Sequence, residues 1–237
     1  MFFLGFILTI GIIPLHAFPG LDRCINQRMF AIILQLQSDL GKEDIDKLCP
    51  NILQIFDCLE SLVVQRTGLT ISEVAQLIPD ETVQNGVKIF LNTRDTFNNL
   101  CTKGMPLNKA YHENFECLSP VSNSLIDCEN KATETYNAYR DFIENSVEAV
   151  NPPSLREKNC MTQSYRFACL ASYAKDKCGD AARDFILNFV KRTTFLKYGV
   201  CSPPEIEDLK SKFLKFIELS GQRGSAFADA FDFKRKK

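Results

Sequence analysis

The chain has 237 residues, of which 45% are hydrophobic and 24% are charged, with 11 glycines and 10 prolines. This composition excludes disordered, collagen-like and low-complexity architectures, and the length suits one large domain or two small ones. The 28 basic and 29 acidic residues give a formal net charge of −1, so the chain has no strong field of one sign to attract nucleic acid.

An apolar segment begins the sequence. Residues 2–15 are nearly all apolar, but they are fewer than the ~20 residues that a membrane-spanning helix needs. Ala17 then offers a small residue for cleavage, as in a secretory signal. The alternative is a buried first helix, which Pro14 and Pro19 would interrupt. We therefore expect a secreted, extracellular protein without a transmembrane segment, organised as a signal peptide (1–17), a disulfide-bonded helical domain (18–220) and a flexible or amphipathic basic tail (221–237).

Apolar residues recur at helical spacing through most of the chain, and no run alternates with period two for long enough to indicate a strand. The patterns predict helices over about 21–40, 45–64, 71–77, 79–99, 120–147, 155–177, 181–196 and 206–217. We expect Pro50 to split or kink the second of these helices and Thr70 to cap the third. Ser119-Pro120 is expected to begin the fifth helix, and a capping box at Ser202 and Glu205 the last. The expected fold is all-α, a disulfide-braced array of roughly seven helices.

One internal similarity is present. Residues 47–62 align without gaps on residues 158–173, with a lysine, two cysteines, a phenylalanine, a leucine and a serine at matching positions. Two interpretations are open. The segments are either copies of a duplicated helical unit, which would make two pseudo-repeats, or two helices that converged on one cysteine pattern.

Ten cysteines follow the expected signal: Cys24, Cys49, Cys58, Cys101, Cys117, Cys128, Cys160, Cys169, Cys178 and Cys201. An even count in an exported chain favours five disulfides. A metal site is the alternative, but the sequence has no Cys-x-x-Cys pair and only one histidine, His112, after the signal. We therefore expect no metal and no other cofactor.

Helix geometry restricts the pairing of these cysteines. A separation of nine residues corresponds to a rotation of about 900°, which places Cys49 and Cys58 on opposite faces of one helix. The same holds for Cys160 and Cys169, so each member of these pairs is expected to bond to a different helix. Pro120 could turn the chain between two further cysteines, which leaves a bond between positions 117 and 128 open.

The last two cysteines are expected to bond to each other. Gly179 can end the helix directly after Cys178, and Gly199 can turn the chain back before Cys201. The competing arrangement joins position 178 to an earlier helix and position 201 to position 160 or 169, and helix geometry does not exclude it.

Motifs for catalysis are absent. The sequence has no Gly-x-Ser-x-Gly elbow, His-Glu-x-x-His pair or phosphate-binding loop. His112 is expected on a helix surface, and the segment 221–224, Gly-Gln-Arg-Gly, is expected to be a helix stop and flexible joint. The neighbouring carboxylates are expected on solvated helix faces: Glu43, Asp44, Asp46, Glu113 and Glu116. We therefore expect no enzymatic activity and assign no catalytic or cofactor-binding residue.

The C-terminal segment combines aromatic and basic residues. Phe227, Phe231 and Phe233 precede the basic residues 234–237. Such a segment could dock on a membrane surface or on an acidic partner. The alternative is a short helix packed on the domain, followed by a solvated end.

The cysteine pattern resembles a known family. Phe-Ala-Cys169-Leu170, Cys178-Gly179-Asp-Ala-Ala and Gly199-Val200-Cys201 are similar to secreted helical cysteine-rich proteins of arthropods, including a haemolymph glycoprotein family, and to a related nematode secreted domain of unknown function. The resemblance implies an extracellular, all-helical, disulfide-bonded protein, and it brings no catalytic residues. The chain departs from that family because it has no Asn-x-Ser/Thr acceptor for glycosylation.

The expected function is that of a non-enzymatic secreted protein of haemolymph or of a gland secretion such as venom, saliva or silk. It would act by binding a protein partner or as a structural component. One alternative is a carrier of lipids or small hydrophobic ligands, because the 19 phenylalanines could line a cavity. A further alternative is an enzyme with an unrecognised site.

Five disulfides predict a mass difference. The intact mature protein should be about 10 Da lighter than its fully reduced form, because each bridge removes two hydrogens. Mass spectrometry before and after reduction measures this difference. Two or more thiols that can be alkylated in the native protein would contradict the prediction.

Overall fold

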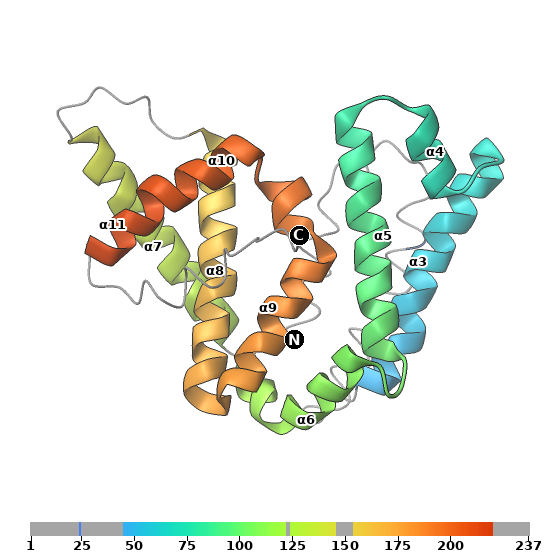
Figure 1. The fold of residues 1–237 in the computed structure, drawn as a ribbon, viewed down its shortest axis with the longest axis horizontal. Helices are drawn as coiled ribbons and strands as arrows, with labels where there is room; N and C mark the ends of the chain where they lie inside the picture. The colour runs from blue at the N-terminus through green and yellow to red at the C-terminus, as the bar shows by residue number, and fades with distance from the viewer. Residues whose placement is uncertain (1–23, 25–44, 122–123, 146–153, 220–237) are drawn as a thin grey trace, which may run out of the picture. The chain divides into compact units, whose positions relative to one another are not determined.

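Helices joined by short turns make up the fold over the residues that the computed structural model describes, which are 24, 45–121, 124–145 and 154–219 (Figure 1). Strands are absent from these ranges, so the all-α prediction is confirmed. The expected signal, almost all of the expected helix at 21–40, and the tail lie outside the described residues.

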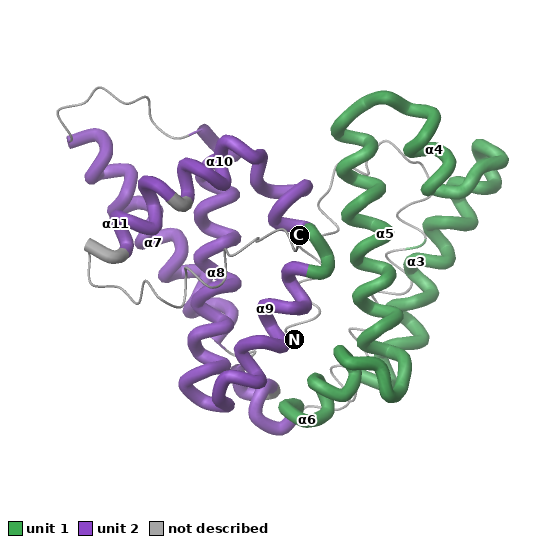
Figure 2. The backbone as a smooth tube through the Cα atoms, viewed as in Figure 1, with its two compact units in different colours: residues 1–115, 192–194 green, residues 116–191, 195–237 purple. Residues whose placement is uncertain are grey.

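The chain divides into two compact units (Figure 2). Unit 1 comprises Met1–Phe115 with Arg192–Thr194, and unit 2 comprises Glu116–Lys191 with Phe195–Lys237. The sequence patterns predict one domain over 18–220, and the structure divides this range in two. Two of the disulfides lie within unit 1 and three within unit 2.

Unit 1 is built on two long helices that lie side by side. They are α3 (Ile45–Thr67) and α5 (Glu81–Cys101), and the short α4 (Ile71–Leu77) connects them and contacts both (Figure 1). Their facing sides are apolar, and the Phe56 ring lies 5.6 Å from that of Phe90 and 5.9 Å from that of Phe97. Burial of each such side chain contributes ~1.5–3 kcal/mol, so this seam is a main source of the unit's stability.

Pro50 was expected to split or kink the second helix, and the split is wrong because α3 stays helical through Pro50. A proline inside a helix costs ~3 kcal/mol, since it removes one backbone hydrogen bond and crowds the preceding turn. The residues around it are firmly held: Leu48 and Ile52 are buried, and Cys49 is bonded to Cys101 of α5. Packing and the disulfide therefore offset the cost of the proline.

Helix α6 (Pro106–Val121) was not among the helix ranges predicted from the periodicity, although His112, Glu113 and Glu116 were expected on helix surfaces. Pro120 lies in its last turn, so the prediction that Ser119-Pro120 begins a helix is wrong, and α7 (Leu125–Glu144) begins after it. Pro106 occupies the first helical position, which is a recognised start signal that could have revealed α6. The side chain of Asn99 accepts the Leu107 backbone N–H at 2.9 Å and so supports this start.

Unit 2 surrounds one long helix, α8 (Leu155–Cys178). Its buried residues include the small Ala168, Ala171 and Ala174, none of which is exposed, and α7 packs along the same helix. The remaining elements follow in chain order: α9 (Asp180–Thr193), the π-helical turn η3 (Leu196–Val200), α10 (Pro203–Asp208), the π-helical turn η4 (Leu209–Phe213) and α11 (Leu214–Leu219). The last two residues of α9 belong to unit 1.

Several helix ends are defined by side chains that the sequence patterns identify. Thr70 and Glu73 form a capping box at the start of α4, and Ser202 and Glu205 form one at the start of α10, so both predicted caps are confirmed. Gly179 ends α8 with φ of 87° and ψ of −176°, a conformation that is open almost only to glycine.

This glycine predicts a stability difference. Gly179→Ala should lower the free energy of unfolding by about 1–3 kcal/mol because the backbone is strained for any other residue. No atom lies within 4 Å of a Cβ built at this position, so the loss would come from the backbone alone. Gly86→Ala is the matched control, since Gly86 lies inside α5 with equal space around it.

The control substitution should raise the free energy of unfolding by about 0.5–1 kcal/mol, since alanine is the better helix former. Denaturant unfolding of both variants measures the two effects. Equal changes of the same sign would contradict the assignment of strain to Gly179.

Candidate functional site

The cysteines form a complete framework, with no free thiol among them. The Cα atoms of bonded cysteines lie 4.9 to 5.7 Å apart, as disulfides require. The bonds are Cys24–Cys58, Cys49–Cys101, Cys117–Cys178, Cys128–Cys169 and Cys160–Cys201. The prediction that cysteines nine residues apart bond to different partners is confirmed for both helices.

The prediction of a bond between Cys178 and Cys201 is wrong, because Cys178 is bonded to Cys117 and Cys201 to Cys160. The reason is the course of the chain after α8. Helix α9 leads away from the end of α8, and the chain returns at η3 beside the start of α8, where Cys160 lies. Eighteen residues of helix separate Cys160 from Cys178, which is roughly 27 Å along the axis. Cys201 therefore meets the far end of α8.

The two units share one pattern of connectivity. In α3 the first cysteine bonds forward, Cys49 to Cys101, and the second bonds back, Cys58 to Cys24. In α8 the first cysteine, at 160, also bonds forward, to 201, and the second, at 169, bonds back, to 128. Each unit thus contains a set of four cysteines in which the first is bonded to the third and the second to the fourth, here called a four-cysteine module. The modules are Cys24, Cys49, Cys58 and Cys101 in unit 1, and Cys128, Cys160, Cys169 and Cys201 in unit 2. This agreement favours duplication over convergence for the two similar segments.

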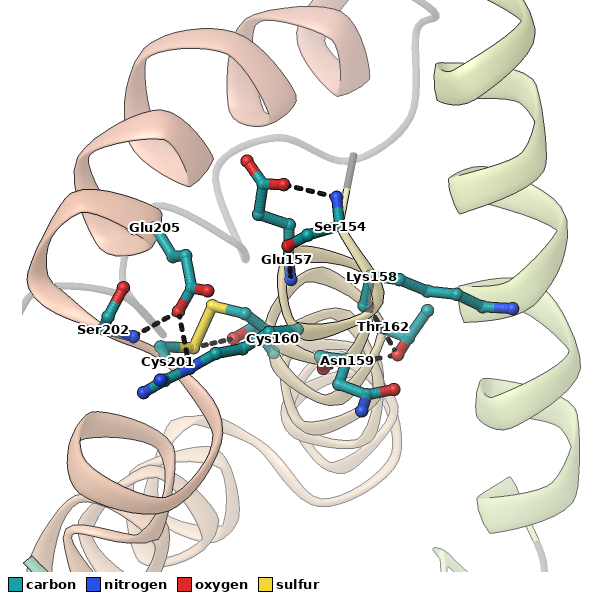
Figure 3. Close-up of a disulfide and its surroundings, with 11 residues drawn as sticks. Ser154, Glu157, Lys158, Asn159, Cys160, Thr162, Cys201, Ser202 and Glu205 are labelled. Carbon is teal, nitrogen blue, oxygen red and sulfur yellow. Dashed lines mark hydrogen bonds and ion pairs between the residues drawn. A yellow bond between two sulfur atoms is a disulfide. The ribbon is translucent and has the colours of Figure 1, made fainter. Parts of the chain in front are cut away.

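The surroundings of the Cys160–Cys201 disulfide fix the starts of two helices (Figure 3). Ser154 and Glu157 form the capping box that begins α8, and the Glu205 carboxylate accepts the Ser202 backbone N–H at the start of α10. The Nε of Arg156 lies 3.3 Å from Oε2 of Glu205, which is only 11% exposed. These contacts connect α8 to α10, so their role is structural.

His112 lies on the surface of α6, as predicted. Its Nε2 is 3.4 Å from Oδ1 of Asp46, and the two side chains are 43% and 58% exposed. Glu113 and Glu116 are exposed on the same helix, as expected. An exposed pair of this kind is typical of a surface contact, and the described residues contain no group of three potential metal ligands.

Several residues singled out in the sequence cannot be placed. They lie outside the described residues: Glu43, Asp44, the segment 221–224, Phe227, Phe231, Phe233 and the basic segment 234–237.

A polar cluster that the sequence patterns did not indicate joins α7 to α8. The Tyr173 hydroxyl donates to Oδ2 of Asp127 at 2.5 Å, and the Lys131 ammonium donates to the same oxygen at 2.8 Å and to the Tyr173 oxygen at 2.7 Å. The hydrogen bond from Lys131, and then that from Tyr173, lower the pKa of Asp127 below its usual value. Asp127 precedes Cys128, so the cluster reinforces the contact between these helices beside the Cys128–Cys169 bond.

Unit 1 presents an apolar and acidic surface where α4 meets α5, here called the α4–α5 corner. Leu77, Ile78 and Val83 are 67%, 39% and 36% exposed. The corner is bordered by acidic side chains, those of Glu73, Asp80 and Glu81, all of them exposed. Residues 67–87 contain these three acidic residues and no lysine or arginine, a signal that the sequence alone could have provided.

One carboxylate of α3 contacts both of the other helices that make up most of unit 1. Oε1 of Glu60 on α3 accepts the Ile71 backbone N–H at 3.1 Å, and its Oε2 lies 3.2 Å from Nη1 of Arg94 on α5. Glu60 therefore connects α3 with both α4 and α5.

Within the described ranges, no helix has the length and apolar character required to cross a bilayer. Comparison of the chain with protein-family models, with curated proteins and with solved structures gives no match.

The cluster around Asp127 predicts a pH-dependent contribution to stability. Its folded pKa lies below the unfolded value of ~3.9, so the charged carboxylate stabilises the folded protein above that pH. The stabilisation is lost as the pH falls through the folded pKa. Wild-type protein should therefore be more stable than Asp127→Asn at pH 7, and the gap should close between pH ~4 and pH ~2.

Denaturant unfolding across this pH range measures the gap. Tyr173→Phe removes one of the two donors and should show a smaller gap with the same pH dependence. Glu134→Gln, at an exposed carboxylate of the same helix, is the control and should match the wild type at pH 7. A gap for Asp127→Asn that stays constant down to pH 2 would contradict the prediction.

Proposed function

We propose that this protein is a secreted, non-enzymatic component of haemolymph or of a gland secretion, and that it acts by binding a protein partner. Its five disulfides support the extracellular location, since such bonds form and persist in oxidising compartments. The resemblance of its cysteine pattern to arthropod haemolymph proteins supports the proposed source. Assembly into a structural material would use the same kind of contact.

The observation that carries this proposal is the α4–α5 corner. Exposed leucine, isoleucine and valine side chains that gather on one surface are typical of protein contacts. Leu77 is 67% exposed at the end of a helix, although burial of a leucine would contribute ~1.5–3 kcal/mol. A partner that covers it would gain that free energy on binding.

The charge of the α4–α5 corner indicates the chemistry of the partner. Glu73, Asp80 and Glu81 are exposed and lie within a few residues of the apolar side chains along the chain, whereas the nearest basic residues along the chain are Arg66 and Lys88. A partner surface with apolar side chains and lysine or arginine at its edge complements this arrangement. The partner is therefore a protein with a basic, amphipathic surface.

The carrier alternative receives less support. The phenylalanines Phe97, Phe189 and Phe213 have none of their surface exposed, and several rings contact other rings at centroid distances of 5.2 to 6.5 Å. These contacts are those of a packed core, which explains the abundance of phenylalanine without a bound lipid.

Native mass spectrometry of the protein purified from its source fluid tests the proposal. We expect a complex with a basic protein at a fixed stoichiometry, which dissociates as the salt concentration rises because ion pairs are screened. The double variant Leu77→Gln, Glu81→Lys should weaken binding of that purified protein by about tenfold or more, because it removes an apolar contact and reverses one charge.

Ile126→Gln is the matched control, since Ile126 is 72% exposed in unit 2, and this variant should bind as the wild type does. A co-purified lipid without a protein would support the carrier alternative instead. Equal binding by the double variant and the control would show that the α4–α5 corner is not the binding surface.

A further inference from the structure

One disulfide lies outside the two four-cysteine modules. Cys117 and Cys178 join α6 to the last residue of α8, within unit 2. The bond has no counterpart in unit 1, where both disulfides belong to the module. The fold pattern that the two units share is therefore complete without it.

This disulfide also differs from the other four in exposure. Cys117 and Cys178 are both half-buried, so water reaches both residues. Each of the other bonds includes at least one cysteine that is 8% exposed or less. The buried members are Cys24, Cys49, Cys128, Cys160, Cys169 and Cys201.

Exposure of both residues matters because thiol–disulfide exchange involves two sulfur atoms. One sulfur must be open to the attacking thiolate, and the other must leave as a thiolate. Cys58 and Cys101 are half-buried and open to attack, but their partners, Cys24 and Cys49, are buried. A thiolate that leaves into an apolar interior is destabilised, so those bonds resist reduction.

Charged neighbours do not provide an alternative explanation. Lys175 lies in the last turn of α8, and its ammonium is 3.2 Å from Oδ1 of Asp180 just beyond the bond. Lys177 and Glu116 flank the two cysteines with opposite charges and are both exposed. The partial exposure of both cysteine residues is therefore the property that distinguishes this bond.

We propose that the Cys117–Cys178 disulfide is a redox-sensitive bond that a thiol reductant opens while the other four disulfides stay intact. The thiolate of the reductant attacks one sulfur and forms a mixed disulfide, and the other sulfur leaves as a thiolate and takes a proton. A second thiol of the reductant then attacks the mixed disulfide. The products are two cysteine thiols and the oxidised, disulfide form of the reductant.

The consequence of opening is local. Reduction releases residues 116–121 of α6 from the end of α8, while Cys128–Cys169 and Cys160–Cys201 still hold α8 to its other neighbours. The two modules keep their connectivity. The proposal concerns a change within unit 2 and does not depend on the binding proposed for the α4–α5 corner.

Partial reduction of the full native chain tests the proposal. The protein is incubated at pH 8 with increasing dithiothreitol or reduced glutathione, trapped with an alkylating reagent and mapped by peptide mass spectrometry. We expect the first reduced species to carry two alkyl groups, on Cys117 and Cys178 in equal amounts. This bond should open at least about tenfold faster than Cys49–Cys101, the internal control with one half-buried cysteine.

A second measurement uses a variant. The double substitution Cys117→Ser, Cys178→Ser should keep the helical circular dichroism of the wild type and should lack the first reduction step. Prior opening of any other disulfide, or simultaneous opening of all five in the native protein, would overturn the proposal.

Discussion

The spacing of two cysteines within one helix is the constraint on which each unit depends. Nine residues of α-helix turn the second cysteine to the face opposite the first, so a helix with this spacing must bond to a neighbour on each side. Helix α3 meets the requirement through Cys24 and Cys101, and α8 through Cys128 and Cys201. A long central helix held on both faces follows directly, and the apolar core forms around it.

Polar contacts connect the helices in addition to the disulfides. Glu60 attaches α4 to α3 and α5, and Glu205 attaches the start of α10 to Arg156 of α8. Each carboxylate accepts a hydrogen bond from a backbone N–H at the start of a helix and also forms an ion pair with an arginine. One side chain therefore stabilises the start of a helix and connects it to a neighbouring helix.

Local sequence signals predicted what depends on local geometry. The helical periodicity, the caps at Thr70 and Ser202 and the helix end at Gly179 were all visible in the sequence, because each depends on residues a few positions apart. Pro50 was misleading because packing from distant residues offsets its local cost. The partner of Cys201 could not be predicted, since it depends on where the chain returns after α9. The charge pattern of the α4–α5 corner was visible in residues 67–87, but the exposure of its apolar side chains depends on tertiary packing.

The connectivity of the modules affects the order in which the disulfides can form. The first four cysteines, from Cys24 to Cys101, pair only with one another, so both of their bonds can close while the later half is still being synthesised. Among these four cysteines, Cys49 and Cys58 are the nearest neighbours in sequence, nine residues apart. Once α3 has formed, the helix holds these two cysteines on opposite faces. Formation of this helix therefore prevents a bond between Cys49 and Cys58.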